Sequence, residues 1–480
     1  MNIETVKKCT TFEMIQYSTG ECAFSLVNNS LIAFAAIYYT DALGLDPILA
    51  GVAMFVSIFW DAVTDPVMGH ISDNTRSRFG KRHPFILLGG VSMAVSFYFL
   101  WQIPEIFQSS SMFLFGYLIV MNLVLRTAFT VFIVPYTALG FEICTEYTGR
   151  TKLQGIRFVL NMVANVFGVA LGWSIFFKDQ GDVRGVTITD NFVTMGTIFT
   201  VATFLIVLFV TFTTRKHIQD SRGEKVTGNR IQDFYSDMKE IIFDKYPRWV
   251  FAYTLVVIFG IAFAGAYQGH LYEHFMKFDG SDKSIAHGIS MVMTAIGALA
   301  ASVLVKRYDK KGAVFIGVIA SVVGNGILSI LFLPGLLRPE QTIAIAGMRI
   351  PFALIIFTFL HGCYWMGNGV LFPVALSMMA DVSEIHQLET GINKDGIYSA
   401  MYSFMLKASS SFGILFSMVC LKGVGFVAGA TSQDPEVAWR LGAATLIAGP
   451  IISLTALLLI RKYPVTKALI ESIRSQIKST

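Results

Sequence analysis

Long apolar segments recur along nearly the whole chain, separated by short polar stretches. Each is long enough for a helix to cross the bilayer core, which takes about 20 residues. Their approximate ranges are 21–40, 48–72, 84–103, 111–138, 156–177, 193–214, 248–270, 285–305, 312–333, 350–380, 397–421 and 437–460. The short alternating segments of a membrane β-barrel are not seen, so no strands are expected. The pattern predicts an all-α membrane protein with twelve transmembrane helices.

A polar stretch in the middle of the chain divides these segments into six and six. We therefore expect a first six-helix bundle at 1–214, a cytoplasmic linker at 215–246, and a second bundle with a cytoplasmic tail at 247–480. The loops after the second helix of each half both carry a basic cluster before an apolar run, DNTRSRFGKRHPFILLGG and VKRYDKKGAVFIGV. This correspondence is typical of a duplicated transporter, although basic loops can also resemble one another by chance.

Composition excludes the soluble classes. Only 14% of the 480 residues are charged, whereas soluble proteins carry about 25%. The net charge of +5 is scattered between apolar runs, which argues against a nucleic-acid partner. The five cysteines have no metal-binding spacing, and no nucleophile–base or phosphate-loop spacing stands out. The chain is therefore not expected to be an enzyme.

Basic residues indicate the orientation of the helices, because cytoplasmic loops of membrane proteins are enriched in Lys and Arg. With the N-terminus in the cytoplasm, 27 of the 37 basic residues fall on the inner side and 8 on the outer side. The other two, Arg126 and Lys407, lie inside helices. This asymmetry predicts that both termini are cytoplasmic, which also requires an even number of helices.

A few ionisable residues lie inside the apolar segments, where a charge costs about 2.5–3.5 kcal/mol on insertion scales. They are Glu21, Asp61, Asp65, Arg126 and Lys407. Asp61 and Asp65 are four residues apart and share a helix face, so two like charges meet in a low dielectric. A bound cation or a proton would relieve their repulsion, and carboxylate oxygens suit a hard cation such as sodium. The pair could instead only form a salt bridge to a basic residue.

Arg126 and Thr130 show the same four-residue spacing on the fourth segment. Thr130 is either a neutral oxygen ligand or a hydroxyl bonded to a carbonyl of its own helix. Arg126 pairs either with a carboxylate of the first two helices or with an anionic group of a substrate. Lys407 lies far from both ends of its segment, which argues against a side chain that only reaches for the membrane interface.

Four stretches resemble signatures of the glycoside–pentoside–hexuronide:cation symporters, a family of the major facilitator superfamily. The most specific is WDAVTDPVMGHISDNTRSRFGKRHPFILLG at 60–89, with D-A-x-x-D-P-x-x-G followed by D-x-T-x-x-x-x-G-K. The others are YSTGECAF with YYTDALGL, VPYTALGFEICTEYTGRTKLQGIR, and MMADVSEIHQLETGINKDGIYSAMYSFMLKASSSFG. The resemblance spans roughly residues 12–460 and implies the two-bundle fold of that superfamily.

The resemblance implies a role for each matching residue. Asp61 and Asp65 match the aspartates of the cation site and Thr130 its hydroxyl, so the aspartates would be metal ligands if the ion is sodium. Lys407 matches a lysine that links the sugar and cation regions. The expected substrate-binding residues are Glu21, Arg126, Arg157, Phe372 and Lys407, in which Phe372, like Tyr364 or Trp365, would offer a stacking surface.

One departure from the family bears on the substrate. Two residues before Pro135, melibiose permease has a sugar-binding aspartate, and this chain has Ile133. An apolar residue cannot accept a hydrogen bond from a sugar hydroxyl, and the aromatic position two residues after the proline is Thr137. Arg126 adds a positive charge that melibiose permease lacks. We therefore expect an acidic substrate such as a uronide.

The first inner loop resembles the gating loop of the superfamily, which clamps helix ends through charge pairs. The matching residues are Asp73, Arg76, Arg78, Gly80, Lys81 and Arg82. Marking the cytoplasmic side of the membrane is an alternative role for the same basic residues.

Together these features predict a symporter that couples uptake of a sugar or glycoside to a cation by alternating access. The coupling ion would be Na+, Li+ or H+, with no other cofactor. The expected partners are the sugar, the cation and the lipid of a bacterial inner membrane, with the monomer as the functional form. Transport of a lysolipid-like or other non-sugar solute on the same fold is the alternative.

Overall fold

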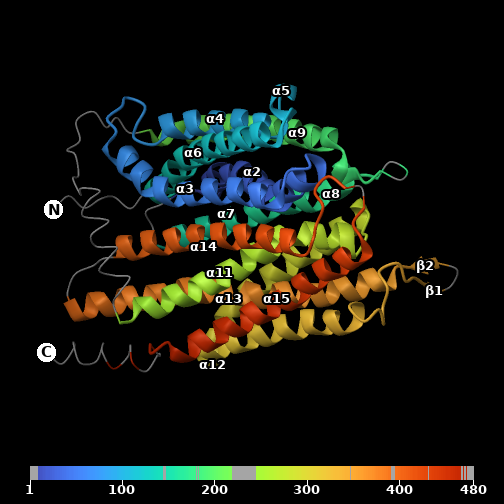
Figure 1. The fold of residues 1–480 in the computed structure, drawn as a ribbon. Coiled ribbons are helices and arrows are strands. Elements are labelled where there is room, and N and C mark those ends of the chain that lie inside the picture. The colour runs from blue at the N-terminus through green and yellow to red at the C-terminus, as the bar shows by residue number, and fades with distance from the viewer. Residues whose placement is uncertain are drawn as a thin grey trace. The chain divides into compact units, whose positions relative to one another are not determined.

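The computed structural model describes residues 9–143, 147–179, 181, 183–218, 245–345, 348–390, 395–430, 432–465, 469 and 472. The chain forms two compact units, Met1–Ile231 and Gln232–Thr480 (Figure 1). Each unit is described by itself. Most of the expected linker, 215–246, lies outside the described residues, so its boundaries stay a prediction.

The first unit is built from helices. In chain order they are α1 (Thr11–Ser18), α2 (Gly20–Ile37), the π-helix η1 (Tyr38–Ala42), α3 (Pro47–Asn74), α4 (His83–Trp101), α5 (Glu105–Gln108), α6 (Ser111–Ile143), α7 (Tyr147–Asn165), the π-helix η2 (Val166–Ala170), α8 (Leu171–Phe176), the 3-10 turn η3 (Gly185–Thr187), α9 (Thr189–Thr214) and the 3-10 turn η4 (Arg215–His217). Their arrangement can be followed in Figure 1.

The second unit is also built mainly from helices. Its elements are α11 (Pro247–His270), the π-helix η5 (Leu271–Phe275), α12 (Gly280–Phe332), strands β1 (Ile343–Ile345) and β2 (Met348–Ile350), α13 (Phe352–Thr390), α14 (Asp395–Gly423) and α15 (Pro435–Lys462). In the described part of the chain, 11 helices are long and apolar enough to cross a membrane.

The twelve predicted segments all fall on these helices, which confirms the predicted fold class. Eleven spans suffice for twelve segments because α12, with 53 residues, carries two of them. The two halves of α12 meet at Asp309, whose φ of 59° is not helical. This break lies in the second basic loop, where the sequence predicted the end of one helix and the start of the next.

The expectation that the chain has no strands is wrong in one place. β1 and β2 form a two-stranded antiparallel hairpin in which Ile343 pairs with Ile350. The hairpin lies between the last span of α12 and α13, outside the apolar core of the spans. Its β-branched isoleucines favour extended backbone, and a pair of three-residue strands is too short to give an alternating pattern.

The π-helices η1 and η5, which follow α2 and α11, end with the same pattern of backbone hydrogen bonds. In the first unit, Leu43 N donates to Tyr38 O at 3.0 Å, and Leu45 N donates to Tyr39 O at 2.8 Å. The second unit repeats this with Met276 N to Leu271 O and Phe278 N to Tyr272 O, at 3.0 and 2.9 Å. A residue with positive φ follows in both, Gly44 at 65° and Lys277 at 54°. This correspondence supports the internal repeat that the basic loops suggested.

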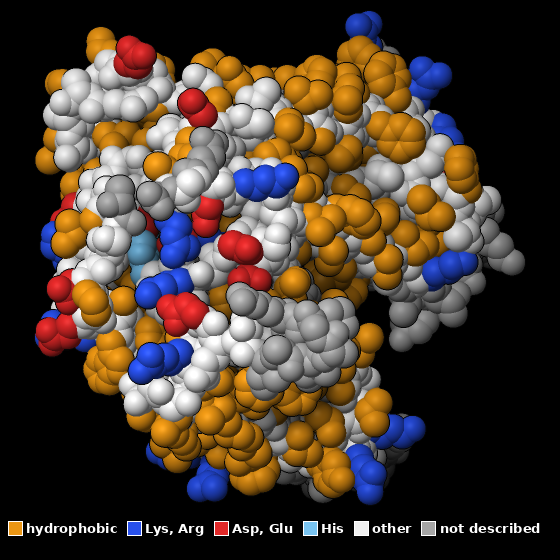
Figure 2. All heavy atoms as spheres, turned by 90° about the vertical axis from the view of Figure 1, so that its right-hand side faces the viewer, with side chains coloured by type: hydrophobic (Ala, Val, Ile, Leu, Met, Phe, Trp, Pro, Cys, Tyr) orange, Lys and Arg blue, Asp and Glu red, His pale blue; other side chains and the backbone are white. Residues whose placement is uncertain are grey.

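Large apolar side chains are exposed along the spans. Leu88, Leu299 and Phe359 are 64%, 70% and 63% exposed, on three different helices. Figure 2, which views the helices end-on, shows broad areas of hydrophobic side chains beside a part of this face where charged side chains gather. A water-facing surface rarely has contiguous apolar patches of this extent, whereas a lipid-facing surface requires them. The chain is therefore an integral membrane protein.

Candidate functional site

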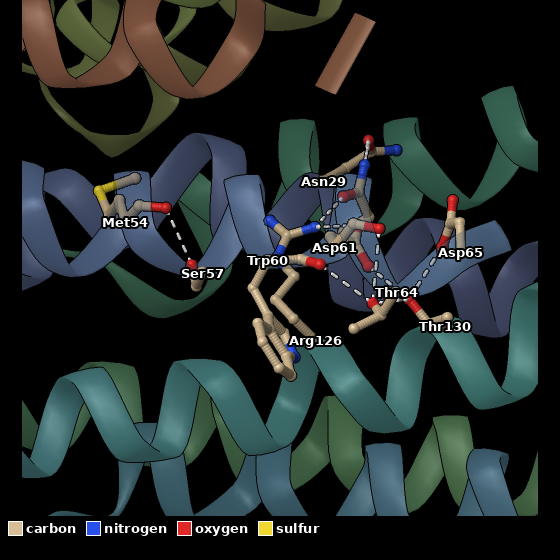
Figure 3. A network of polar contacts seen from close by, with 10 residues as sticks. Asn29, Met54, Ser57, Trp60, Asp61, Thr64, Asp65, Arg126 and Thr130 are labelled. Carbon is tan, nitrogen blue, oxygen red and sulfur yellow. Dashed lines mark hydrogen bonds and ion pairs between the residues drawn. The ribbon is translucent and has the colours of Figure 1, made fainter. Parts of the chain in front are cut away.

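The two predicted cation-site aspartates meet one hydroxyl group. Thr130 Oγ1 on α6 lies 2.6 Å from Asp61 Oδ1 and 2.9 Å from Asp65 Oδ1 on α3. Thr64 Oγ1 lies 3.4 Å from Thr130 Oγ1. Asp61 is 2% exposed, so this cluster lies inside the first unit. Figure 3 shows the threonines between the two carboxylates.

The cluster has too few hydrogen-bond donor hydrogens for its closely spaced oxygens, which favours an additional proton or cation there. A threonine hydroxyl has one hydrogen, so Thr130 can donate to one of the two carboxylates only. The other close oxygen–oxygen contact is favourable only if a carboxylate carries a proton or a cation lies between the oxygens. The oxygen-only donor set suits a hard cation such as Na+ or Li+. Among the described residues, no group of three or more His, Cys, Asp or Glu side chains offers a transition-metal site.

A proline in α3 frees a backbone carbonyl oxygen near the two aspartates. Pro66 lies inside α3, directly after Asp65. Because proline has no amide hydrogen, the carbonyl of Ala62 loses the partner that a regular helix would give it. This carbonyl belongs to the residue that follows Asp61. The D-A-x-x-D-P motif thus places two carboxylates and one carbonyl that lacks its helix hydrogen-bond donor within about one turn.

Arg126 lies beside this cluster and contacts it loosely. Its Nη1 is 3.7 Å from Asp61 Oδ2 and 3.4 Å from Asn28 Oδ1 on α2. Charge-assisted hydrogen bonds are usually about 2.7–2.9 Å long. The buried Nε of Arg126 has no hydrogen-bond partner among the described residues. Of the two partners considered for Arg126, the structure shows the helix carboxylate, at long range.

Glu21 and Arg157, both expected at the sugar site, form a close pair in the first unit. Arg157 Nε donates to Glu21 Oε1 at 2.6 Å, and Nη2 contacts the same oxygen. Nη2 also lies 3.4 Å from Thr137 Oγ1. Thr137 is the position where the family has an aromatic residue, so the structure brings together three of the residues that the sequence comparison singled out.

Two tyrosines support this pair. Tyr17 and Tyr136 stack with ring centroids 4.5 Å apart, and each hydroxyl donates to the backbone carbonyl of the other residue, at 2.7 and 2.9 Å. The Arg157 guanidinium lies 5.3 Å from the Tyr136 ring centroid, within cation–π range. A Cβ at Gly140 would lie 2.4 Å from the Tyr17 hydroxyl, so glycine is needed for this close approach of the first helix to α6.

The predicted gating loop is organised by Arg82. Its guanidinium lies 2.6 Å from Asp73 Oδ1 and 2.8 Å from Glu142 Oε1, and it donates to Ser72 Oγ at 2.6 Å. Burial lowers the pKa of Arg82, but the hydrogen bonds and charges of Glu142 and Asp73 outweigh this and raise it above its ordinary value. Arg82 thereby ties the ends of α3 and α6 to the start of α4.

The other loop residues are placed less centrally. Gly80 has a φ of 75°, a left-handed conformation that glycine adopts without strain. Arg76 and Arg78 are exposed, and the Arg78 guanidinium lies 4.6 Å from the Phe79 ring centroid. Lys81 is half-buried. Sequence reasoning missed Glu142, because it lies beyond the end of the apolar segment that was taken as the helix.

Arg82→Ala is expected to lower the free energy of unfolding by about 1–2 kcal/mol, because several hydrogen bonds to charged groups are lost at a partly screened site. Arg78→Ala in the same loop should change it by less than about 0.5 kcal/mol, because it breaks no ion pair between helices. Thermal unfolding of the purified protein in detergent measures both. Equal losses in the two variants would contradict the role given to Arg82.

Two predicted residues belong to the second unit. Lys407 lies half-buried near the middle of α14, and Phe372 on α13 is 42% exposed. Tyr364 and Trp365, the other aromatic candidates, are 1% and 5% exposed and packed within the unit. Phe372 is therefore the accessible aromatic of the three. The roles of Lys407 and Phe372 stay predictions.

The second unit also holds charge pairs that could not be found from the sequence. Lys310, at the break in α12, contacts Asp381 of α13 and donates to Ser377 O at 2.8 Å, and both side chains of the pair are largely buried. Lys283 is fully buried in α12 and paired with Glu273 of η5. It lies before the predicted apolar segment at 285–305, because α12 begins five residues earlier, at Gly280.

A cavity of about 450 Å³ is lined by residues of α3, α4 and α6. Its lining is nearly all apolar and includes Trp60, Leu88, Gly89, Val124 and Thr127. Its polar side chains are Trp60, Ser92 and Thr127, and Trp60 Nε1 donates to Thr127 Oγ1 at 3.0 Å. Such a lining offers few partners for sugar hydroxyls. The polar cluster around Asp61 and the pair around Glu21 are therefore the candidate sites of the first unit.

Three known proteins that are similar to this chain are named as symporters. It is 27% identical to the inner membrane symporter YicJ of Escherichia coli over 43% of this chain and 44% of that protein. The putative glycoside/cation symporter YagG of E. coli is 25% identical over 98% of this chain and 95% of its own. The sodium-dependent lysophosphatidylcholine symporter 1-A of Danio rerio is 23% identical over 96% and 87%. These relatives support cation-coupled transport, and none of the three is named as an enzyme.

Structural comparison supports the same architecture. The inward-open xylose transporter XylE from E. coli superimposes with a TM-score of 0.62 at 14% identity, covering 97% of this chain and 99% of that one. At this identity the match establishes the transporter fold alone. The sequence family described as MFS/sugar transport protein matches residues 16–467, which is nearly the whole chain. The chain therefore belongs to the MFS/sugar transport protein family and is a membrane transporter.

Proposed function

We propose that this protein is a symporter that takes up a sugar or glycoside together with a monovalent cation by alternating access. The observation that carries the proposal is a pair of carboxylates, Asp61 buried and Asp65 half-buried, that share the hydroxyl of Thr130. The two carboxylates lie around one hydroxyl hydrogen, with Arg126 3.7 Å from one of them, and their mutual repulsion favours the binding of a proton or a metal cation. In a membrane interior such a site marks an ion or proton pathway.

The cation would bind between Asp61, Asp65 and Thr130. These residues, with the Ala62 carbonyl nearby, offer oxygen ligands from two helices, so ion binding draws α3 and α6 together. Na+, Li+ and H+ all fit these groups, and the proposal requires no other cofactor. A ligand that binds tightly only when the cation is present must raise the affinity of the cation by the same factor.

The substrate would bind near Glu21 and Arg157, which offer an acceptor and several donors for sugar hydroxyls. The name of YagG, a putative glycoside/cation symporter, supports this substrate class. Ile133 in place of a sugar-binding aspartate and the additional Arg126 favour an acidic sugar such as a uronide. By analogy with the inner membrane symporter YicJ, we place the protein in a bacterial inner membrane. We expect the monomer to be the functional form.

A lysolipid-like substrate is the second candidate. The Danio rerio lysophosphatidylcholine symporter matches almost the whole chain at nearly the same identity as YagG. The polar groups around Glu21 and Arg157 favour the sugar, because a lysolipid would need an apolar path for its acyl chain.

The substrate assignment is tested by competition between matched sugars. Membrane vesicles that contain the protein should take up a methyl glucuronide at least about tenfold better than the methyl glucoside, because the glucuronide adds a carboxylate for Arg126. Radiolabelled uptake with an inward sodium or proton gradient measures this. Preference for the neutral glucoside, unchanged in Arg126→Gln, would contradict an acidic substrate. Uptake of a lysolipid with neither sugar would favour the second candidate.

A further inference from the structure

Arg126 is held more weakly than Arg82 and Arg157, two largely buried arginines of the first unit. Arg157 and Arg82 each make hydrogen bonds of 2.6 Å to their partners. Arg126, with 7% exposure, reaches Asp61 only at 3.7 Å and leaves its buried Nε without a partner among the described residues. A guanidinium has five N–H donors, and leaving buried donors unsatisfied is costly. This arrangement suits an arginine that is kept available for another anion.

The partners of Arg126 connect the two candidate sites. Asp61 uses Oδ1 for Thr130 and presents Oδ2 to Arg126, so the guanidinium competes with a cation for the same carboxylate. On the other side, Asn28 Oδ1 holds Nη1 at 3.4 Å. Asn28 lies seven residues after Glu21 on α2, which places it on the same helix face. A substrate bound at Glu21 would therefore extend along this face toward Arg126.

We propose that Arg126 is an exchangeable counter-ion, paired with Asp61 before the substrate binds and with an anionic group of the substrate afterwards, and that Asn28 positions it for the exchange. This inference rests on the proposed function and specifies how the two ligands are coupled. When the substrate anion takes Arg126, one positive charge leaves Asp61, and the cation binds more tightly. When the cation binds first, it takes the place of Arg126 at Asp61, and the guanidinium becomes available to the anion.

If Arg126 is exchanged in this way, replacing it should change the affinities for the cation and for the acidic sugar in opposite directions. In Arg126→Gln, the affinity for the cation without substrate should rise about tenfold, because the competing guanidinium is gone. The affinity for methyl glucuronide should fall about tenfold, while that for methyl glucoside changes by less than threefold. Both changes lie within the 5–150-fold range of typical coupling between sites. An arginine that only stabilised the fold would weaken both ligands together.

The experiment measures ligand-dependent thermal stability of the purified full-length protein, since a ligand stabilises the folded state in proportion to its binding. Sodium chloride is titrated against choline chloride, and proton binding is followed by a pH titration, each with and without the two sugars. Asn28→Ala should lower the coupling between methyl glucuronide and the cation at least threefold. Asn29→Ala is the matched control, because Asn29 contacts Ser25 and Asn28 but not Arg126.

The outcomes separate this inference from the proposed function. Wild-type protein that binds neither Na+ nor a titrating proton would contradict the proposed function. If the wild type binds cation and sugar, an unchanged or weaker cation affinity in Arg126→Gln would overturn the exchange. Equal effects of Asn28→Ala and Asn29→Ala would overturn the role of Asn28. Opposite shifts in Arg126→Gln, with a loss of coupling in Asn28→Ala alone, are the expected result.

Discussion

Asp65→Asn is expected to abolish cation-driven uptake, with a loss of about 100-fold, near the upper end of typical coupling between sites. The amide has the size of the carboxylate but no charge, so the cluster with Thr130 no longer requires a cation. Asp65 is the better position for this test because Asp61 also faces Arg126 at 3.7 Å. Removing the Asp61 charge would leave a buried guanidinium without its counter-ion and strongly destabilise the fold.

Asp41→Asn is the matched control for this prediction. Asp41 is 3% exposed in the first unit, and it accepts a hydrogen bond from Thr40 Oγ1 at 2.7 Å, away from the cation cluster. Uptake driven by a cation gradient should stay within about threefold of the wild type in this variant. Sugar exchange without a gradient shows whether Asp65→Asn still binds substrate. Full cation-stimulated accumulation in Asp65→Asn would defeat the assignment of the cation site.

Arg157→Gln is expected to lower the free energy of unfolding by about 3–5 kcal/mol, the usual cost of removing one partner from a buried ion pair. The remaining Glu21 carboxylate is 7% exposed and would lose its two closest donors. The double variant Glu21→Gln/Arg157→Gln should regain most of this stability, because no unpaired charge is left. Both variants should lose sugar uptake, since neither retains the charged acceptor and donor together.

Thermal unfolding in detergent and radiolabelled uptake distinguish stability from function at this pair. Arg440→Gln is the control, because Arg440 pairs with Glu436 at the surface, where the side chains are 49% and 69% exposed. Such exposed pairs contribute about 0–1 kcal/mol. Uptake recovered in the double variant would show that the pair serves the fold and not the substrate. A loss in Arg157→Gln no larger than in Arg440→Gln would show that the pair is not buried in the working protein.

Most of the fold could be predicted from hydrophobicity, because each span must satisfy its backbone within a helix and present apolar side chains to lipid. The apolar segments did not reveal the π-helices η1 and η5, because these are only five residues long and contain polar residues that are also typical of loops. The hairpin of β1 and β2 was missed because segments of three residues carry no pattern. Both features depend on local backbone hydrogen bonds that hydrophobicity does not encode.

The candidate site was predictable in part. Four-residue spacing placed Asp61 with Asp65 and Arg126 with Thr130, each pair on one helix face. Spacing could not show that α3 and α6 bring these two faces together, and only the family resemblance suggested it. Asn28 and Glu142 escaped notice because one is neutral and the other lies beyond an apolar segment. Long-range packing decides which polar groups meet, and that information is absent from any single segment.

The central claim is that a cation gradient drives sugar uptake through the cluster of Asp61, Asp65 and Thr130. The most direct measurement is the accumulation of a radiolabelled sugar in vesicles after an inward sodium or proton gradient is imposed. We predict accumulation above the external concentration that collapses when an ionophore dissipates the coupling gradient and is absent in Asp65→Asn. Accumulation that persists without either gradient, or that Asp65→Asn leaves unchanged, would contradict the claim.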